Sequence, residues 1–266
     1  MKKRSTRSPR RKKPVPAPAS LELLPVSGLP EIRKRDDLIG RVVEAARRSQ
    51  IAFEDGDVLV IAQKIVSKAE GRLVRLSTLR PSSTALQLAA KLKKDPRLVE
   101  VILRESRRIV RSDPVLIVET HHGFVCANAG VDQSNVPGSN VVSLLPRDPD
   151  RSARRLAASL RRRTGKRVAV IISDTFGRPW RLGLTNVAIG AAGVPVLLDL
   201  RGARDLHGKP LHATILAVAD ELAAAAGLVM GKAAGIPAVV IRGYGYRSVL
   251  DPAARIIRPA NEDLFR

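Results

Sequence analysis

Runs of apolar residues bounded by turn-forming residues predict the strands of this protein. Three runs are continuous and rich in β-branched residues, which is typical of strands buried on both faces. They are 58–62, 167–173 and 238–241. A shorter strand is expected at 21–26, and the segments 115–119 and 124–127 predict a hairpin.

Apolar residues at helical spacing predict helices between these strands. The best marked helix follows Asp148, because Pro149 suits a first helical turn and Gly165 suits the position after a last one. Other helices are expected at 36–49, at 213–226 and over 82–111, where Asp95-Pro96 separates two of them.

Two aspartates each follow one of the apolar runs and begin a polar stretch. Asp132 follows Val131, and Asp174 follows Ile172-Ser173. Because Mg²⁺ is bound through one or two carboxylates together with substrate phosphates, two such acids at strand exits suggest a site for a metal and a phosphate. The alternative, that each aspartate only forms a turn or caps a helix, stays open, since aspartate favours both positions.

Basic residues lie close to these acids in the sequence. Gln63-Lys64 and Lys68 follow the strand 58–62, where lysines are ready phosphate contacts, although exposed loop lysines are also common. The stretch 177–186 is expected to be a loop, and it contains Arg178 and Arg181. Guanidinium groups bind carboxylates and phosphates, so we assign both arginines to an acidic substrate on charge alone.

The composition adds a strong positive charge. The formal net charge is +22, and residues 1–20 hold eight Lys or Arg without an acid and are expected to form a disordered tail. A basic protein attracts nucleic acid, anionic membranes or phosphorylated small molecules. Aromatic residues make up only 3%, which disfavours a platform that stacks unpaired bases. The arginine-rich helix at 151–163 keeps nucleic-acid binding as an alternative.

Several common classes of site lack their sequence signatures. Lys232 is followed by Ala233, so the chain does not have the phosphate loop of P-loop proteins, and no strand is followed by the glycine pattern of Rossmann folds. Cys126 lies in an apolar stretch and is interpreted as a buried structural thiol. The basic N-terminus is not followed by an apolar segment, and no run is long enough for a membrane helix, so we expect a soluble, cytoplasmic protein.

The remaining candidates are carboxylates for a metal, lysines for phosphates and arginines for an acidic substrate. The residues alone therefore indicate a metal-dependent enzyme that uses a nucleotide.

Three motifs make the prediction more specific. The chain contains three motifs of this kind. They are Ala127-Asn128-Ala129-Gly130-Val131-Asp132-Gln133-Ser134-Asn135, Ser173-Asp174-Thr175-Phe176-Gly177-Arg178 and Gln63-Lys64-Ile65-Val66-Ser67-Lys68. Together with Pro25-Val26-Ser27-Gly28-Leu29-Pro30 and Gly235-Ile236-Pro237, they resemble the coenzyme F420:L-glutamate ligase family, also described as F420-0:γ-glutamyl ligases. The similarity is collinear over about residues 21–245.

The resemblance implies a reaction and a set of site residues. The enzyme would use GTP to join L-glutamate to the lactyl carboxylate of F420-0 through an acyl phosphate, and the addition of further γ-linked glutamates stays open. It implies that Asp132, Asp174 and Thr175 bind Mg²⁺ or Mn²⁺, with K⁺ as a further ion. The residues that it implies for GTP are Leu29, Pro30, Glu31, Ile32, Gln63, Lys64, Lys68, Asn135, Met230, Gly231, Lys232, Gly235, Ile236 and Pro237.

The resemblance also implies the fold and the partners. We expect residues 21–266 to form a two-part α+β catalytic domain that assembles as an intertwined homodimer, rather than a doubly wound sheet. The expected partners are F420-0 and L-glutamate, with neither a membrane nor a nucleic acid among them. A ligase of the same fold that acts on another phosphorylated carboxylic acid is the main alternative.

Overall fold

The computed structural model describes residues 20–263 except 139 and 232. Its centre is a five-stranded mixed sheet in the order β1-β12-β2-β8-β9. The strands are β1 (Glu22–Pro25), β12 (Ala238–Arg242), β2 (Val58–Ala62), β8 (Ala169–Arg178) and β9 (Arg181–Ala192). Only β2 and β8 pair in parallel, and the other neighbours are antiparallel. The strands predicted at 21–26, 58–62, 167–173 and 238–241 are thereby confirmed.

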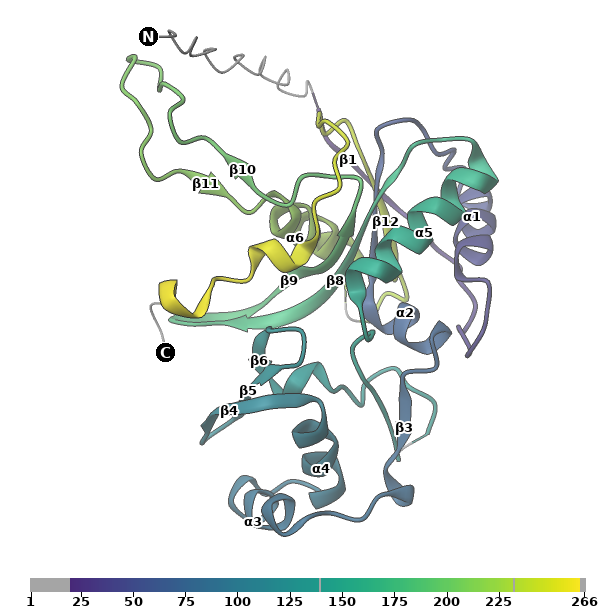
Figure 1. The fold of residues 1–266 in the computed structure, drawn as a ribbon. Helices are drawn as coiled ribbons and strands as arrows, with labels where there is room; N and C mark the ends of the chain where they lie inside the picture. The colour runs from purple at the N-terminus through teal and green to yellow at the C-terminus, as the bar shows by residue number, and fades with distance from the viewer. Residues whose placement is uncertain (1–19, 139, 232, 264–266) are drawn as a thin grey trace, which may run out of the picture.

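Helices cover both faces of this sheet (Figure 1). On one face α1 (Leu38–Arg48) and α5 (Pro149–Thr164) pack against Leu59 and Ile61 of β2. On the other face α6 (Val218–Met230) packs against Val58 and Val60. Successive residues of a strand point to opposite faces, so an uninterrupted apolar run is what a sheet covered on both sides requires.

The ends of α5 agree with the sequence prediction. The Asp148 carboxylate accepts the backbone N–H of Arg151 at 2.8 Å and caps the first turn, and Pro149 follows it. Gly165 ends the helix with a φ of 72°, a left-handed conformation that costs glycine little. The helix expected at 213–226 is shifted, since α6 begins at Val218 and ends at Met230.

A smaller unit follows α2 (Gln63–Ala69) in the sequence and lies below the central sheet in Figure 1. Its core is formed by buried residues of two helices and a three-stranded sheet. Its elements are β3 (Leu73–Arg75), η1 (Leu76–Thr78), α3 (Ser83–Leu92), α4 (Pro96–Arg104), β4 (Ser106–Ser112), β5 (Leu116–Thr120), β6 (Val125–Ala127), η2 (Asn128–Gly130) and β7 (Val141–Ser143). The mixed α+β fold is confirmed.

Two local predictions were wrong. Residues 106–111 belong to the strand β4 rather than to the end of a helix, because they pair with β5 in an antiparallel ladder. The loop expected at 177–186 is instead the end of β8, a turn and the start of β9. Lys64 and Lys68, which follow β2 as expected, lie on the helix α2.

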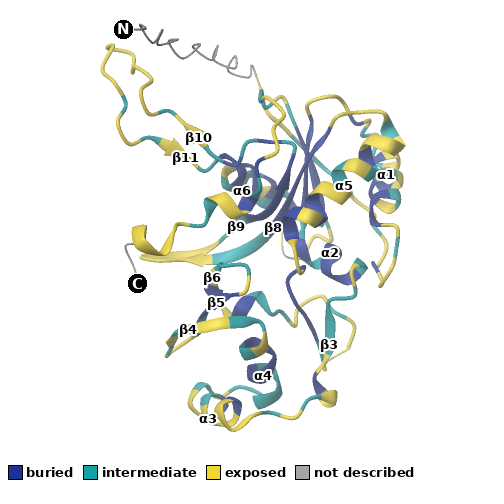
Figure 2. Cartoon of the chain, in the orientation of Figure 1, coloured by how far each residue is buried: buried dark blue, intermediate teal, exposed yellow. Residues whose placement is uncertain are grey.

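Two projecting segments carry exposed apolar residues. The turn between β8 and β9 is one, and the arm that contains β10 (Leu198–Asp199) and β11 (Ile215–Leu216) is the other. The arm extends away from the sheet and is largely exposed (Figures 1 and 2). Two 3₁₀ helices, η3 (Ala253–Ile256) and η4 (Ala260–Glu262), follow β12.

Two sequence predictions concern the termini and membrane spans. Of the basic tail predicted at 1–20, only Ser20 lies within the described residues. None of the helices in the described part of the chain is both long and apolar enough to cross a membrane.

Glu100 ties the two helices of the smaller unit together, and its replacement by glutamine is expected to destabilise the protein. Its carboxylate accepts the backbone N–H of Ser82 at 2.9 Å and the Arg104 Nε at 2.8 Å. The hydrogen bonds from Ser82 and then Arg104 lower its pKa to about 2. Hydrogen bonds to a charged group of this kind contribute about 1.5–3 kcal/mol, so Glu100→Gln should lower the unfolding free energy at pH 7 by that order.

The stabilisation that Glu100 provides depends on pH. The pKa of Glu100 in the folded state lies below its ordinary value of 4.5, so its contribution is present above pH 4.5 and disappears as the pH falls toward 2. Urea unfolding at several pH values measures the difference between wild type and variant. Glu22→Gln, on an exposed position of β1, is the matched control. A difference that stays constant with pH would contradict this account.

Candidate active site

A cleft of about 970 Å³, called here the central cleft, opens where β2 and β8 end their parallel pairing. In that register Ala62 lies opposite Ser173. The parallel pairing ends at this pair of residues, so Gln63 and Asp174, which come next in the two segments, lie at the same end of the pairing. Asp132, the segment 134–137 and residues within 227–231 and 235–237 complete the walls.

The central cleft brings together most of the residues singled out in the sequence. The predicted site residues that line it are Leu29, Pro30, Glu31, Ile32, Gln63, Lys64, Lys68, Asp132, Asn135, Asp174, Thr175, Met230, Gly231, Gly235, Ile236 and Pro237. Five separate segments of the chain contribute these residues, so the fold gives them a common location. Their roles toward a nucleotide or a metal stay predictions.

Asp132 and Lys64 form the polar centre of one wall. Lys64 Nζ lies 2.6 Å from Asp132 Oδ2, and it also donates to the backbone oxygen and the Oγ of Ser134 at 2.6 and 2.8 Å. The other oxygen of Asp132 accepts the Ser134 backbone N–H at 2.7 Å. The turn that follows Asp132 thus surrounds a cation, the lysine ammonium, with oxygen atoms.

Two opposing effects determine the acidity of Asp132. Partial burial acts to raise its pKa, since a carboxylate loses hydration. The hydrogen bonds from Lys64 and Ser134, together with the lysine charge, outweigh burial and hold the pKa of Asp132 below its ordinary value. Asp132 is therefore an anion at neutral pH.

Replacing Lys64 by methionine is expected to raise the pKa of Asp132, because the main hydrogen bond that opposes burial is removed. The carboxyl carbon chemical shift of Asp132, followed against pH by NMR, measures this change. Lys91→Met removes an exposed lysine of α3 that does not line the cleft and should leave the pKa unaltered. An unchanged pKa of Asp132 in Lys64→Met would refute the electrostatic coupling between the two side chains.

A second cation lies deeper in the wall. The Lys68 side chain is 5% exposed, and its Nζ lies 2.6 Å from Glu31 Oε1. On the same helix the buried Ser67 hydroxyl donates to Gln63 Oε1 at 2.8 Å and fixes the orientation of that amide. Because α2 starts directly at the end of β2, Lys64 and Lys68 are one helical turn apart on the side that faces the cleft.

The opposite wall comes from the hairpin of β8 and β9. Asp174 is not at a strand exit, as the sequence suggested, but inside β8, opposite Val187. The next residue, Thr175, donates its hydroxyl to Asn186 Oδ1 at 3.0 Å across the ladder. A Cβ on Gly227 would lie 3.0 Å from the Asn186 side chain, so glycine lets α6 approach β9 here.

Ser173 and Cys126 lie beside Asp174. The Ser173 hydroxyl is buried, and within the described part of the chain it has no hydrogen-bond partner. Cys126 is buried as predicted, and burial, followed by the negative charge of Asp174, raises its pKa to about 12. The thiol is therefore protonated and does not supply a nucleophile.

The donor set of the central cleft suits a hard divalent cation. Asp132, Asp174 and Thr175 offer carboxylate and hydroxyl oxygens, and Lys64 shows that a cation is accommodated beside Asp132. In the residues that the structure describes, no group of three or more His, Cys, Asp or Glu could hold a metal. A metal here would depend on phosphate and water oxygens for its remaining ligands, which is how Mg²⁺ is usually bound.

Some predicted residues do not reach the cleft. Arg178 and Arg181 lie at the turn between β8 and β9, exposed and outside the lining, and Arg178 Nη2 donates to the Leu182 carbonyl at 3.0 Å. Their assignment to an acidic substrate stays a prediction. Lys232 lies outside the described residues.

Sequence reasoning missed several lining residues. Ser134 supplies oxygens to Lys64, and Asn186 bonds Thr175. Ser134 lies two residues after Asp132 in one of the motifs given above, so the sequence could have indicated it as a site residue. Asn186 could be found only from the strand register, which places it opposite Thr175.

Comparison with known proteins gives a consistent family. The family model described as F420-0:Gamma-glutamyl ligase matches residues 28–243. A coenzyme F420:L-glutamate ligase of Methanothermobacter thermautotrophicus is 48% identical over 250 residues, covering 92% of this chain and 99% of that protein. Those of Methanopyrus kandleri and Archaeoglobus fulgidus are 50% and 43% identical, covering 93% and 92% of this chain and 98% and 96% of their own lengths. The chain belongs to the F420-0:γ-glutamyl ligase family.

Proposed function

We propose that this protein joins L-glutamate to F420-0 in the biosynthesis of coenzyme F420, with GTP as the source of free energy. The observation that carries the proposal is the central cleft, whose lining brings Asp132 and Asp174 together with Lys64 and Lys68 where β2 and β8 end their parallel pairing. The family and the names of the relatives supply the substrates. We also propose a cytoplasmic location for this reaction.

The proposed chemistry has two steps. A carboxylate oxygen of F420-0 attacks the γ-phosphorus of GTP, a P–O bond to the acceptor forms, and GDP leaves with the electron pair of the broken bond. The amino nitrogen of glutamate then attacks the acyl carbon, phosphate leaves with the C–O bonding pair, and the nitrogen loses a proton. Positioning and neutralisation of charge supply most of the catalysis in such phosphoryl transfers.

The chain's own residues have separate tasks in this scheme. Lys64 and Lys68 place positive charge beside the phosphates, and Gln63, Asn135 and the segments 29–32 and 230–237 contact the nucleotide. Asp132, Asp174 and Thr175 hold Mg²⁺ or Mn²⁺, and K⁺ is a further ion of the site. When bound, the divalent ion neutralises charge on the phosphate oxygens.

We also propose that the protein is a homodimer in which the projecting segments contact the partner subunit. Trp180 and Leu182 at the β8–β9 turn are 87% and 98% exposed, and Leu206 on the β10–β11 arm is fully exposed. Apolar side chains gathered on projecting segments mark interaction surfaces. This assembly would also give Arg178 and Arg181 a role at the subunit interface. Light scattering of wild type and of Leu182→Asp measures the mass in solution, and a monomeric wild type would refute the dimer.

The experiment that tests the proposed function measures GDP and phosphate release. Release is expected only when F420-0, L-glutamate, GTP and a divalent metal are all present. If the acceptor carboxylate is labelled with heavy oxygen, one labelled oxygen should appear in the released phosphate. Phosphate without label would contradict the acyl phosphate. Release with another phosphorylated acid, but not with F420-0, would identify a different acceptor.

A further inference from the structure

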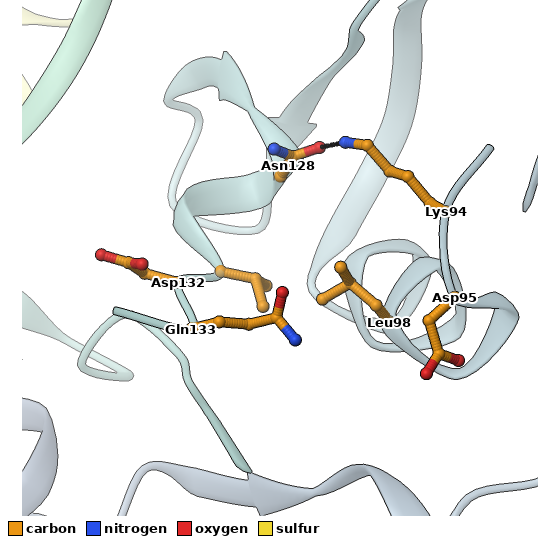
Figure 3. A pocket seen from close by; sticks show the side chains of 7 residues that line it. Lys94, Asp95, Leu98, Asn128, Asp132 and Gln133 are labelled. Carbon is orange, nitrogen blue, oxygen red and sulfur yellow. Dashed lines mark hydrogen bonds between the residues drawn. The ribbon is translucent and has the colours of Figure 1, made fainter. Parts of the chain in front are cut away.

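A second cavity adjoins the central cleft at Asp132 and has a volume of about 430 Å³. Its lining includes Lys94, Leu98, Asn128 and Gln133, and we call it the Lys94 cavity (Figure 3). The Asp132 carboxylate points away from Lys94 and Gln133 in this view, which agrees with its contact to Lys64 in the central cleft. The chain around Asp132 therefore separates two cavities.

The fold holds Lys94 firmly between two helices. α3 ends at Leu92, the next residue Lys93 caps it with a left-handed φ of 52°, and the Lys94 backbone N–H donates to the Ala89 carbonyl at 3.0 Å. The next residue, Asp95, caps α4 by accepting the backbone N–H of Arg97 at 2.8 Å. A lysine between two capped helix ends has a rigid backbone, which is how binding groups are usually supported.

The charge of Lys94 has no acidic counterpart in the described part of the chain. Its Nζ donates to Asn128 Oδ1 at 2.6 Å, and no ion pair is formed there. The two nearby carboxylates are used elsewhere, since Asp95 binds Arg97 through both oxygens and Asp132 binds Lys64. Burial lowers the pKa of Lys94, because an ammonium group loses hydration without gaining an anion.

The opposite side of the cavity is built from strained backbone and an amide. Asn128 and Ala129 have φ values of 53° and 56°, and Gly130 continues the left-handed turn at 67°. Such conformations cost about 1–3 kcal/mol each outside glycine and are concentrated at functional sites. The turn directs Asn128 toward Lys94, and the Gln133 amide enters the same cavity (Figure 3).

We propose that the Lys94 cavity is the subsite for an anionic group of an acidic substrate, bound by Lys94 Nζ with the amides of Asn128 and Gln133 as neighbours. The inference rests on the proposed function, which requires two acidic substrates in addition to the nucleotide. L-Glutamate offers carboxylates, and F420-0 offers a carboxylate and a phosphodiester. A substrate anchored here adjoins the chain at Asp132, next to the nucleotide side of the site.

Lys94→Gln tests the charge, because glutamine can still donate to Asn128. Loss of a charge-assisted hydrogen bond should raise the KM of one acidic substrate about tenfold, while the KM of GTP stays within about twofold. The substrate with the altered KM identifies the anion. Lys91→Gln, an exposed lysine on α3, is the matched control, and Lys94→Arg should retain much of the affinity. Unchanged KM values for both acidic substrates would overturn the proposal, since a purely structural lysine predicts that result.

A measurement on the wild-type enzyme avoids dependence on the folding of a variant. Reductive methylation of lysines, analysed by mass spectrometry, should show that one acidic substrate protects Lys94 but not Lys91. GTP with Mg²⁺ should leave Lys94 reactive. Protection by neither acidic substrate would refute the subsite. Failure of the proposed function is distinct, because the wild type would then release no GDP with any combination of substrates.

Discussion

Asp174→Asn is expected to lower turnover more than about a hundredfold while the protein stays folded, since even the outer partners of a metal ligand contribute 10–100-fold. Asparagine keeps the shape of the side chain but removes the negative charge that the cleft presents from β8. The substitution should also weaken the binding of Mn²⁺ in the presence of GTP, which electron paramagnetic resonance detects. Turnover should fall through lost charge, not lost structure.

The control for Asp174→Asn is another carboxylate on an element of the cleft. Glu221 lies on α6, is exposed and does not line the cleft, so Glu221→Gln should have the activity of the wild type. Thermal unfolding of both variants shows whether the fold is intact. An active Asp174→Asn enzyme with normal Mn²⁺ binding would contradict the assignment of this residue.

Gly190→Ala is expected to cause the largest loss of stability, about 3 kcal/mol, because it forces two main elements apart. A Cβ at this position of β9 would lie 2.5 Å from the carbonyl carbon of Pro149 and 2.8 Å from its Cβ. The start of α5 cannot move freely, since the Asp150 carboxylate accepts the backbone N–H groups of Ala191 and Ala253 at 2.8 and 2.7 Å. The substitution must therefore break these hydrogen bonds or distort β9.

Gly177→Ala is the matched control for Gly190→Ala. Gly177 belongs to the same hairpin, and its nearest neighbour to an added Cβ is Leu184 Cδ2 at 3.9 Å, an ordinary contact. Its unfolding free energy should stay within about 1 kcal/mol of the wild type. Urea unfolding of the two variants gives the comparison. Equal stability of both would show that α5 and β9 do not approach as closely as described.

The elements that the sequence predicted correctly carry their signals locally. The run 58–62 is apolar at each position because β2 is covered on both faces, and Asp148, Pro149 and Gly165 mark the ends of α5. β4 was missed because it is formed by antiparallel pairing with β5, a strand further along the chain, where Glu119 also pairs with Arg107 and Arg108. The β8–β9 turn was missed because Trp180 adopts a left-handed φ of 61°, a conformation that is rare for a bulky residue and is not expected from its type.

In the site, too, some residues could be predicted from local sequence and others depend on the fold. Asp132 and Asp174 stood out as polar residues after apolar runs, and the motif resemblance supplied most of the other residues that line the central cleft. The contact between Lys64 and Asp132 joins residues 68 positions apart, and it depends on how the smaller unit folds back onto the sheet. No sequence pattern marked Lys94. Its importance depends on contacts that only the fold shows: Lys94 bonds the amide of Asn128, and the carboxylate of the adjacent Asp95 pairs with Arg97 instead.

The most direct test of the proposed ligation is the mass of the product that the wild-type enzyme makes from F420-0, L-glutamate, GTP and Mn²⁺. The account predicts a product heavier than F420-0 by one or more glutamyl residues, formed only when all four components are present. An acceptor of unchanged mass under these conditions would contradict it.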